Sequence, residues 1–522
     1  MAWLVAAFLL VAGGRFDSYV FRGAPSEHSL LNVEGMLAVA FLLILYLRAR
    51  PGQMRATFAT VAPATVVAII TGVIILAFLA ALRNPFLFDD YTHVADASGY
   101  TWHTALQQFG GETRLPGLFF RPVGFFLYWL NYLWAGANPV LWHASGLAMH
   151  AAAGCLTYAL CREVGLSQPA GLGAAVLFSI QGAAAETVAW IDARFDLMAT
   201  LLVLLSILLV CRYLTTAGRG WLVAALAAGA AAMLTKESGF ALPLLIACLA
   251  FFRGQAERRR IWLAAGWAGA IAAALFAYRW WALGGIGGYR NPGGPPQVAQ
   301  FNILHTLNAL LLREWAILFF PVNWSMPLGL ASRIAVAAIP LILLACALTA
   351  RVSSRRQLLG CLAFAIAASL PVQHLLLIGS DLGGTRNLYM ASIGWVLLWG
   401  VVLDGMNGKP ALIAACALLS VHLLLLEHNL QAWRNAAELA KSVCTEFGRS
   451  VEPTTGIVSV RGLPSARNGA AFLHNGFAQC VEMNSGFPAA RIQVREPSDQ
   501  SRPVGDVREF VWSEARGRLE AQ

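Results

Sequence analysis

The chain has 522 residues, of which 58% are hydrophobic and only 12% are charged, and its formal net charge is +10. A single soluble core cannot bury so much apolar surface, so these values exclude a cytosolic enzyme, a disordered chain and a small disulfide scaffold. The positive charge does not indicate nucleic acid binding. Residues Glu427 to Gln522 hold 11 basic and 11 acidic residues, so the whole excess lies in residues 1–426.

Apolar segments recur along the first four fifths of the chain and predict an all-α polytopic membrane protein with about 13 transmembrane helices. The predicted spans are 1–13, 31–47, 64–82, 139–160, 169–185, 196–211, 220–234, 239–252, 261–282, 334–350, 357–378, 388–403 and 411–426. The first is short for a bilayer core about 30 Å thick, so it fits an interfacial or re-entrant helix as well as a span.

Basic residues gather in alternate connections between these spans. They are Arg48, Arg50, Arg55, Arg162, Arg212, Arg219, Arg253, Arg258, Arg259, Arg260, Arg351, Arg355, Arg356 and Lys409. Short cytoplasmic loops retain Lys and Arg, so the pattern places these loops and the N-terminus in the cytoplasm. The loops 83–138, 186–195, 235–238, 283–333 and 379–387 then lie outside with the tail. This orientation requires residues 301–320 to lie as a helix at the membrane interface.

The chain divides into a membrane domain, residues 1–427, and a tail, residues 428–522. The two long external loops of the membrane domain are 83–138 and 283–333. Strand-like alternation in the tail predicts a small soluble extracytoplasmic α/β domain that caps the outer face. Cys444 and Cys480 are the only cysteines in the tail, and both a disulfide and two free thiols remain open.

Two adjacent carboxylates, Asp89 and Asp90, follow the third span by only seven and eight residues. They are held at the boundary between water and lipid, where an acid pair can supply a general base, share a proton or bind a divalent cation. His143 and His150 lie two helical turns, or about 10 Å, apart, which excludes a shared metal. His150 is interpreted as a packing residue, whereas His143 lies nearer the outer end.

Further charged residues lie at the predicted outer ends of spans, where a charge embedded in apolar sequence is costly and usually functional. They are Arg121, Glu186, Arg194, Asp196, Lys236, Glu237 and Arg386, with Tyr389 beside the last. A cationic pocket that faces carboxylates at one membrane level suits a lipid with a phosphate head group.

The order of FDD, RP, WH, ETVAWIDARFDLMA, LTKES and RNLYMASIG resembles the GT-C superfamily of polytopic membrane glycosyltransferases over residues 64–400. Within it, the chain is most similar to the protein O-mannosyltransferase-like branch and its bacterial relatives without TPR repeats. The resemblance implies inverting transfer of a sugar from a polyprenyl-phosphate donor to an acceptor hydroxyl on a protein, lipid or glycan. It also implies a bacterial inner membrane location with a periplasmic tail and no nucleic acid partner.

Matched to the family motifs, Asp89 or Asp90 corresponds to the first acidic motif, and Glu186 to the acid of the second. Lys236 with Glu237 corresponds to the KE pair, and Arg386 with Tyr389 to RxLY. The sequence departs from the family where Gln181 and Gly182 stand near Glu186 in place of a histidine motif, and Ala391 stands in place of Pro. These departures leave the metal requirement open: a divalent cation, Mg²⁺ or Mn²⁺, would bind Asp89 and Glu186.

The hypothesis assigns three tasks. Asp89, in preference to Asp90, removes the acceptor proton, and Lys236, Arg386, Arg121 and Arg194 stabilise the leaving phosphate. The apolar groove between the spans holds the lipid chain of the donor. Supporting roles are assigned to Glu186, Asp196, Glu237, His143 and Tyr389. The main alternative is a transporter or flippase of lipid-linked sugar, although the sequence contains no inverted repeat and its ionisable residues gather at one face. A non-enzymatic scaffold for polysaccharide assembly is a second alternative.

Overall fold

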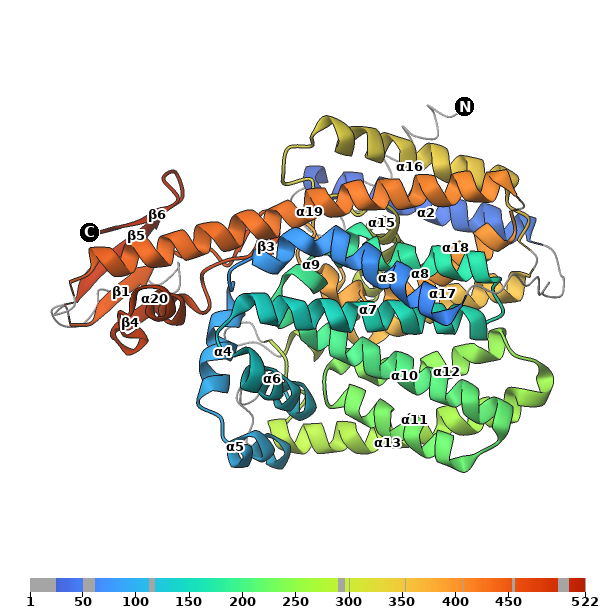
Figure 1. The fold of residues 1–522 in the computed structure, drawn as a ribbon, viewed down its shortest axis with the longest axis horizontal. Helices are drawn as coiled ribbons and strands as arrows, with labels where there is room; N and C mark the ends of the chain where they lie inside the picture. Colours follow the sequence, from blue (N-terminus) through green and yellow to red (C-terminus); the bar gives the residue numbers. More distant parts are fainter. Residues whose placement is uncertain are drawn as a thin grey trace.

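The computed structural model describes residues 25–49, 62–111, 118–289, 296–299, 301–352, 354–406, 408–452, 456–495 and 507–521. The predicted segment 1–13 lies outside these residues, as do Arg50 and Arg55 of the first basic loop. In the described part of the chain, helices form a bundle, and one long helix leads from the bundle to a small domain with a β-sheet (Figure 1).

The bundle is built from long apolar helices, with shorter helices in the connections between them. They are α2 (Pro25–Arg48), α3 (Pro63–Phe78), α4 (Asp89–Ser98), α5 (Trp102–Gln107), α6 (Pro122–Ala135), α7 (Pro139–Glu163), α8 (Gln168–Ile180), α9 (Ala185–Ala189), α10 (Arg194–Thr216), α11 (Arg219–Met233), α12 (Leu242–Cys248), α13 (Gln255–Leu283), α14 (Ile303–Asn308), α15 (Glu314–Phe319), α16 (Leu330–Thr349), α17 (Arg355–Ser369), α18 (Ala391–Asp404) and α19 (Lys409–Ser450).

Eight helices of the described chain are long and apolar enough to cross a membrane. The helix pair Gln168–Ile180 and Gly182–Ala189 passes the same test but is bent by 42°, and three further apolar helices are shorter: Arg219–Met233, Glu237–Phe251 and Ala391–Asp404. Each predicted segment after residue 13 therefore coincides with a helix. The prediction of an all-α polytopic membrane protein is confirmed, whereas the number of 13 spans stays a prediction.

The loops that the charge pattern assigns to the outer side meet at one end of the bundle. Residues from 83–138, 186–195, 235–238, 283–333 and 379–387 line a single cavity there. The basic loops meet one another at the opposite helix ends: Arg355 donates to the carbonyl of Ala49 at 3.0 Å, and Arg260 to that of Leu214 at 2.8 Å. The outer loops and the basic loops therefore lie at opposite ends of the bundle, as the charge pattern predicts.

The stretch 301–320 differs from its predicted interfacial position. It forms α14, a five-residue π-helical turn (Ala309–Arg313) and α15, and both Arg313 and Glu314 are fully buried. α15 packs against α2, so the polar centre of the stretch lies in the protein interior and not on a membrane surface. The sequence pattern was misleading because a helix buried in protein and one at an interface both combine apolar and polar faces.

The helix α19 runs for 42 residues without a break through the predicted domain boundary at residue 428. Figure 1 shows that its first part packs along the bundle, while its last turns project beyond the bundle and carry the small domain. The domain contains α20 (Phe477–Ser485) and strands β1 (Val458–Arg461), β2 (Ala466–Arg467), β3 (Ala470–Ala471), β4 (Ile492–Arg495), β5 (Arg508–Ser513) and β6 (Arg518–Ala521).

The main sheet of this domain has the strand order β4-β1-β5-β6. The central strand β1 pairs in parallel with both β4 and β5, and β6 pairs antiparallel with β5. Val458, Ser459 and Val460 of β1 are all completely buried, as expected for a parallel strand that is covered on both faces. β2 and β3 form a separate hairpin. The tail is therefore an α/β unit, as its strand-like alternation predicts.

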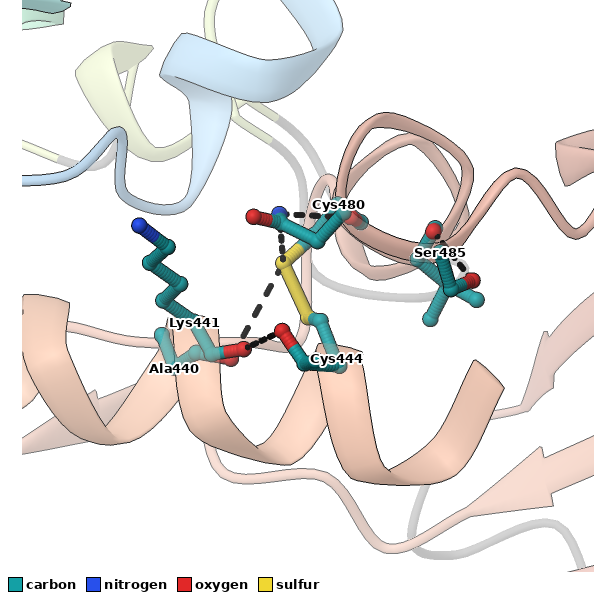
Figure 2. Close-up of a disulfide and its surroundings, with 8 residues drawn as sticks. Ala440, Lys441, Cys444, Cys480 and Ser485 are labelled. Carbon is teal, nitrogen blue, oxygen red and sulfur yellow. Dashed lines mark hydrogen bonds between the residues drawn. A yellow bond between two sulfur atoms is a disulfide. The ribbon is translucent and has the colours of Figure 1, made fainter. Parts of the chain in front are cut away.

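A disulfide joins Cys444 on α19 to Cys480 on α20 (Figure 2). Their Cα atoms are 5.9 Å apart, within the range that disulfides adopt. Of the two alternatives that the sequence left open, the structure therefore contains the disulfide. It ties α20 to the helix that continues into the bundle.

Candidate functional site

A cavity of about 810 Å³ lies between the bundle and the C-terminal domain. In the described chain its wall contains four carboxylates and four cations: Asp89, Asp192, Asp196, Glu237, Arg121, Lys236, Arg279 and Arg386. Apolar and aromatic side chains complete the bundle side of the wall, among them Phe119, Phe125, Phe195, Phe240 and Phe276. A site with mixed charges and an apolar lining can hold a ligand that has both an anionic head and an apolar chain.

Asp89 is the first residue of α4, and its side chain faces the cavity. One of its carboxylate oxygens accepts a hydrogen bond from the side-chain amide of Asn475 at 3.1 Å. Burial, and after it the negative charge of Asp192, raises the pKa of Asp89 to about 6. A carboxylate with such a pKa is ionised near neutral pH yet basic enough to accept a proton from a hydroxyl group.

Asp90 points away from the cavity, although it is adjacent to Asp89 in the sequence. It is 1% exposed and accepts hydrogen bonds from the backbone N–H groups of Leu87 at 2.9 Å and Asp192 at 2.8 Å. Burial raises its pKa well above the usual range of an aspartate. The geometry thus separates the two acids: Asp89 reaches the cavity, and Asp90 ties its loop to the segment that follows α9.

His93 and Asp192 form an ion pair beside Asp89. His93 lies four residues after Asp89 on α4, and Asp192 lies in the short 3₁₀ helix Ile191–Ala193. Both side chains line the cavity. Residues four apart lie on the same helical face, so the pair brings an imidazole and a second carboxylate to the side of the wall that carries Asp89.

Two connected groups of charges lie on the bundle side of the cavity. Arg121 donates from Nε and Nη2 to Glu237 at 3.0 and 2.7 Å, and Arg279 lies 3.5 Å from the other oxygen of the same carboxylate. Lys236 forms an ion pair with Asp196 at the start of α10. These carboxylates fix the positions of the cations while N–H groups of each cation stay available for a further anionic ligand.

Arg386 lies in the 3₁₀ turn Thr385–Leu388 and pairs with Glu186. The guanidinium of Arg386 also lies over the ring of Trp190, 4.8 Å from its centroid. The side chain of Glu186 is only 3% exposed, whereas that of Arg386 is 28% exposed. Glu186 therefore supports the cation from behind, and Arg386 is the member of the pair that lines the cavity.

Besides Asp90 and Glu186, three further predicted site residues lie outside the residues that line the cavity. Arg194 is 1% exposed, donates to the carbonyl of Trp142 at 3.1 Å and lies over the Trp142 ring. His143 is buried and contacts the carbonyl of Asn84 at 3.2 Å. The hydroxyl of Tyr389 lies 2.6 Å from Nδ1 of His150. The contacts of all three lie within the protein.

A divalent cation between Asp89 and Glu186 does not fit these contacts. Glu186 already accepts hydrogen bonds from Thr385 and from the backbone and side chain of Arg386. Glu186 is not among the residues that line the cavity. Within the described ranges, no group of three or more His, Cys, Asp or Glu side chains is arranged to hold a metal ion.

Among the residues of the wall that sequence reasoning missed are His93, Asp192, Arg279 and Asn475. For His93 a signal was present, because its spacing of four from Asp89 predicts a shared helical face. Asp192 lies between Glu186 and Asp196 in the ETVAWIDARFD segment, where only those two acids were predicted to belong to the site. The contact of Asn475 with Asp89 joins positions 386 residues apart, and no local pattern indicates it.

Comparisons with known proteins give distant relatives, and no known family profile matches the chain. A segment of 197 residues is 28% identical to protein O-mannosyl-transferase TMTC1 of Mus musculus and covers 34% of this chain. The matched part spans about a fifth of that relative, 21% of its length. The resemblance to the protein O-mannosyltransferase-like family that the motifs indicate is confirmed by this relative.

Among solved structures, the chain is similar to the oligosaccharyltransferase AglB from Archaeoglobus fulgidus in complex with an inhibitory peptide and a dolichol-phosphate. Identity is 12%, the TM-score is 0.47, and the match covers 82% of this chain and 64% of AglB. It is also similar to ArnT from Cupriavidus metallidurans bound to undecaprenyl phosphate. Identity is 13%, the TM-score is 0.44, and the match covers 87% of this chain and 94% of ArnT.

Proposed function

We propose that this protein is a membrane glycosyltransferase that moves a sugar from a polyprenyl-phosphate donor to an acceptor hydroxyl, with inversion at the anomeric carbon. The observation that carries the proposal is the position of Asp89. Its carboxylate faces a cavity whose opposite charges, Arg121, Lys236 and Arg386, are each fixed by a buried or half-buried acid. The names of the relatives, an O-mannosyl-transferase and proteins bound to polyprenyl phosphates, support the same class of reaction.

In the proposed reaction, the acceptor hydroxyl oxygen attacks the anomeric carbon from the face opposite the phosphate. A bond forms between the acceptor oxygen and the sugar, and the bond between the sugar and the phosphate oxygen breaks with its electron pair. Asp89 takes the hydroxyl proton as general base. The leaving polyprenyl phosphate gains negative charge, which Arg121, Lys236 and Arg386 stabilise.

The paired cations suit this task because their positions are fixed before the phosphate binds. Arg121 uses two of its five donors for Glu237, and its guanidinium also lies over the ring of Phe119, 4.2 Å from the centroid. Fixed donors need little reorganisation as charge develops on the leaving group. The apolar part of the wall, with Phe240 and Phe276, would accommodate the first isoprene units of the donor.

We further propose that the cavity opens on the extracytoplasmic side, in a bacterial inner membrane. The basic loops lie at the other end of the bundle, and short cytoplasmic loops retain such residues. The Cys444–Cys480 disulfide near the cavity supports the same orientation, because disulfides persist in oxidising compartments. Sugar and acceptor class, whether protein, lipid or glycan, are left to experiment.

The proposal is tested by transfer of labelled sugar in proteoliposomes that contain the purified protein, a polyprenyl-phosphate sugar and a panel of acceptors. We expect transfer by the wild type and a large loss in the Asp89→Asn variant. An Asp89→Asn variant that kept the wild-type rate would contradict the proposed role of the carboxylate.

A transporter or flippase of lipid-linked sugar is the alternative function. It would move a labelled donor between leaflets without releasing polyprenyl phosphate, so the two functions differ in the product formed. The charged residues described here gather at one end of the bundle, whereas a transporter is expected to bind near mid-membrane. This placement favours the transferase.

A further inference from the structure

One wall of the cavity comes from the C-terminal domain and not from the bundle. The segment 474–479, which leads into α20 and forms its first residues, contributes every one of its positions to the lining. Residues Ile492 and Val494 of β4 extend the same wall. The cavity is therefore incomplete without the domain that the sequence predicts only as a cap.

Asn475 makes the closest functional contact of this segment. Its side-chain amide donates to one oxygen of Asp89 at 3.1 Å. An amide that binds one oxygen restricts rotation of the carboxylate. The other oxygen is then held in a defined direction, as a general base requires.

The backbone around Asn475 is fitted tightly to the residue before Asp89. Gly476 has φ +74°, and a Cβ atom at this position would lie 2.2 Å from the carbonyl oxygen of Phe88. Only glycine combines this left-handed conformation with so close a backbone approach. The segment is thus packed closely against the start of α4, next to Asp89.

The disulfide fixes the same segment from the other side. Cys480 lies in the first turn of α20, five residues after Asn475, and Cys444 lies on α19, which continues into the bundle. Figure 2 shows the bond crossing from α19 to α20 near Lys441. Asn475 is therefore held between a backbone contact with Phe88 and a covalent link to α19.

We propose that Asn475 is a positioning residue for Asp89 and that the Cys444–Cys480 disulfide maintains its position, so that the C-terminal domain is part of the catalytic site. The inference rests on the proposed function, because it assigns Asn475 a role in the transfer reaction. It also predicts that transfer depends on the oxidation state of one cysteine pair.

The groups around the Asp89 carboxylate determine in which direction the pKa of Asp89 should shift when Asn475 is replaced. Burial and Asp192 raise its pKa, whereas His93, Asn475 and Arg386 lower it. Removal of the Asn475 amide therefore moves the acidic limb of the pH–rate profile to higher pH. A variant that only destabilised the fold would lower the amount of active enzyme without moving this limb.

The first test compares Asn475→Ala with Asn435→Ala, since Asn435 is an exposed asparagine of α19. For Asn475→Ala we expect kcat to fall by roughly 10- to 100-fold, the range for loss of a hydrogen bond to a charged group, and the acidic limb to move to higher pH. If Asn475→Ala kept the wild-type kcat and an unmoved acidic limb while Asp89→Asn was inactive, this inference would be overturned and the proposed function would stand. A wild type that transfers no sugar from any polyprenyl-phosphate donor would overturn the proposed function first.

The second test removes the disulfide in the full-length protein. We expect Cys444→Ser combined with Cys480→Ser to reproduce the loss and the shifted limb of Asn475→Ala, and to be insensitive to dithiothreitol. The wild type should lose activity on reduction, whereas Cys416→Ser, at an exposed free cysteine of α19, should behave as the wild type. Full activity of the wild type after complete reduction, verified by thiol counting, would overturn the role of the disulfide.

Discussion

Arg386 contacts Glu186 through two parts of the same residue: its backbone N–H donates to Oε2 at 3.0 Å, and its guanidinium pairs with Oε1. Thr385 donates to the same Oε2 at 3.1 Å. One buried carboxylate thus fixes both the turn and the direction of its cation. The guanidinium lines the cavity, where we place the donor phosphate.

The first prediction concerns this cation. We expect Arg386→Ala to lower kcat by roughly 10²- to 10³-fold, the loss seen when one transition-state donor is removed. Arg386→Lys should recover little, because an ammonium cannot reproduce the planar fork of the guanidinium. Initial rates at saturating donor measure the effect, and Arg333→Ala, at an exposed arginine of α16, serves as the control. Full rescue by lysine would contradict a directional role.

The second prediction concerns pH. Since Asp89 acts as a base, transfer needs its ionised form, and its pKa of about 6 sets the position of the acidic limb. We expect the rate to be constant above this limb and to decline as the pH falls through about 6. Asp89→Asn should lower kcat by about 10²- to 10⁴-fold at pH values above the limb. A rate that rises as the pH falls through this region would contradict the assignment.

The third prediction concerns His93. The interaction with His93 lowers the pKa of Asp89, whereas the charge of Asp192 raises it. His93→Gln removes the first influence and leaves the Asp192 carboxylate without its ion-pair partner. Both changes act in the same direction, so the acidic limb should move to higher pH. His103→Gln, on the neighbouring helix α5, is the control, and its pH–rate profile should match that of the wild type. An acidic limb that moves to lower pH in His93→Gln would contradict the prediction.

The sequence was sufficient to predict which loops share the cavity. Charge segregation assigns each loop to a side, and it depends on composition alone. Asp89, Lys236 and Arg386 were found for the same reason: each charge interrupts apolar sequence at the end of a span. These residues line the cavity in the structure.

What the sequence could not predict is the direction of each side chain. Asp89 and Asp90 are adjacent, yet one faces the cavity and the other binds two backbone N–H groups in the interior. Arg194 carries the same charge as Arg386 but is surrounded by Trp142 and Tyr128. Such differences depend on contacts between segments far apart in the chain, which periodicity does not encode.

The fourth prediction concerns metal ions. Because Glu186 is engaged by Arg386 and Thr385, and Asp192 by His93, neither carboxylate is free to share a cation with Asp89. We expect treatment with EDTA, followed by removal of the chelator, to leave the transfer rate unchanged. Addition of Mg²⁺ or Mn²⁺ should not raise it. A rate that is abolished by EDTA and restored by Mn²⁺ would show that a cation binds through other ligands.

The fifth prediction separates structural from catalytic roles at Tyr389. Its hydroxyl lies 2.6 Å from Nδ1 of His150, whose Nε2 lies 3.0 Å from the Ser179 carbonyl oxygen. Tyr389→Phe leaves a buried imidazole nitrogen without its partner, which costs about 1–3 kcal/mol. We therefore expect a lower melting temperature in detergent, with kcat unchanged well below the transition.

The control for this fifth prediction is Tyr213→Phe, which removes a hydroxyl from another buried tyrosine, on α10. It should leave both the melting temperature and kcat near the wild-type values, because the Tyr213 hydroxyl makes no hydrogen bond within the residues that the structure describes. The opposite result for Tyr389→Phe, an unchanged melting temperature with a large fall in kcat, would place this hydroxyl in the reaction. In that case the cavity would have to extend to the His150 pair when the donor binds.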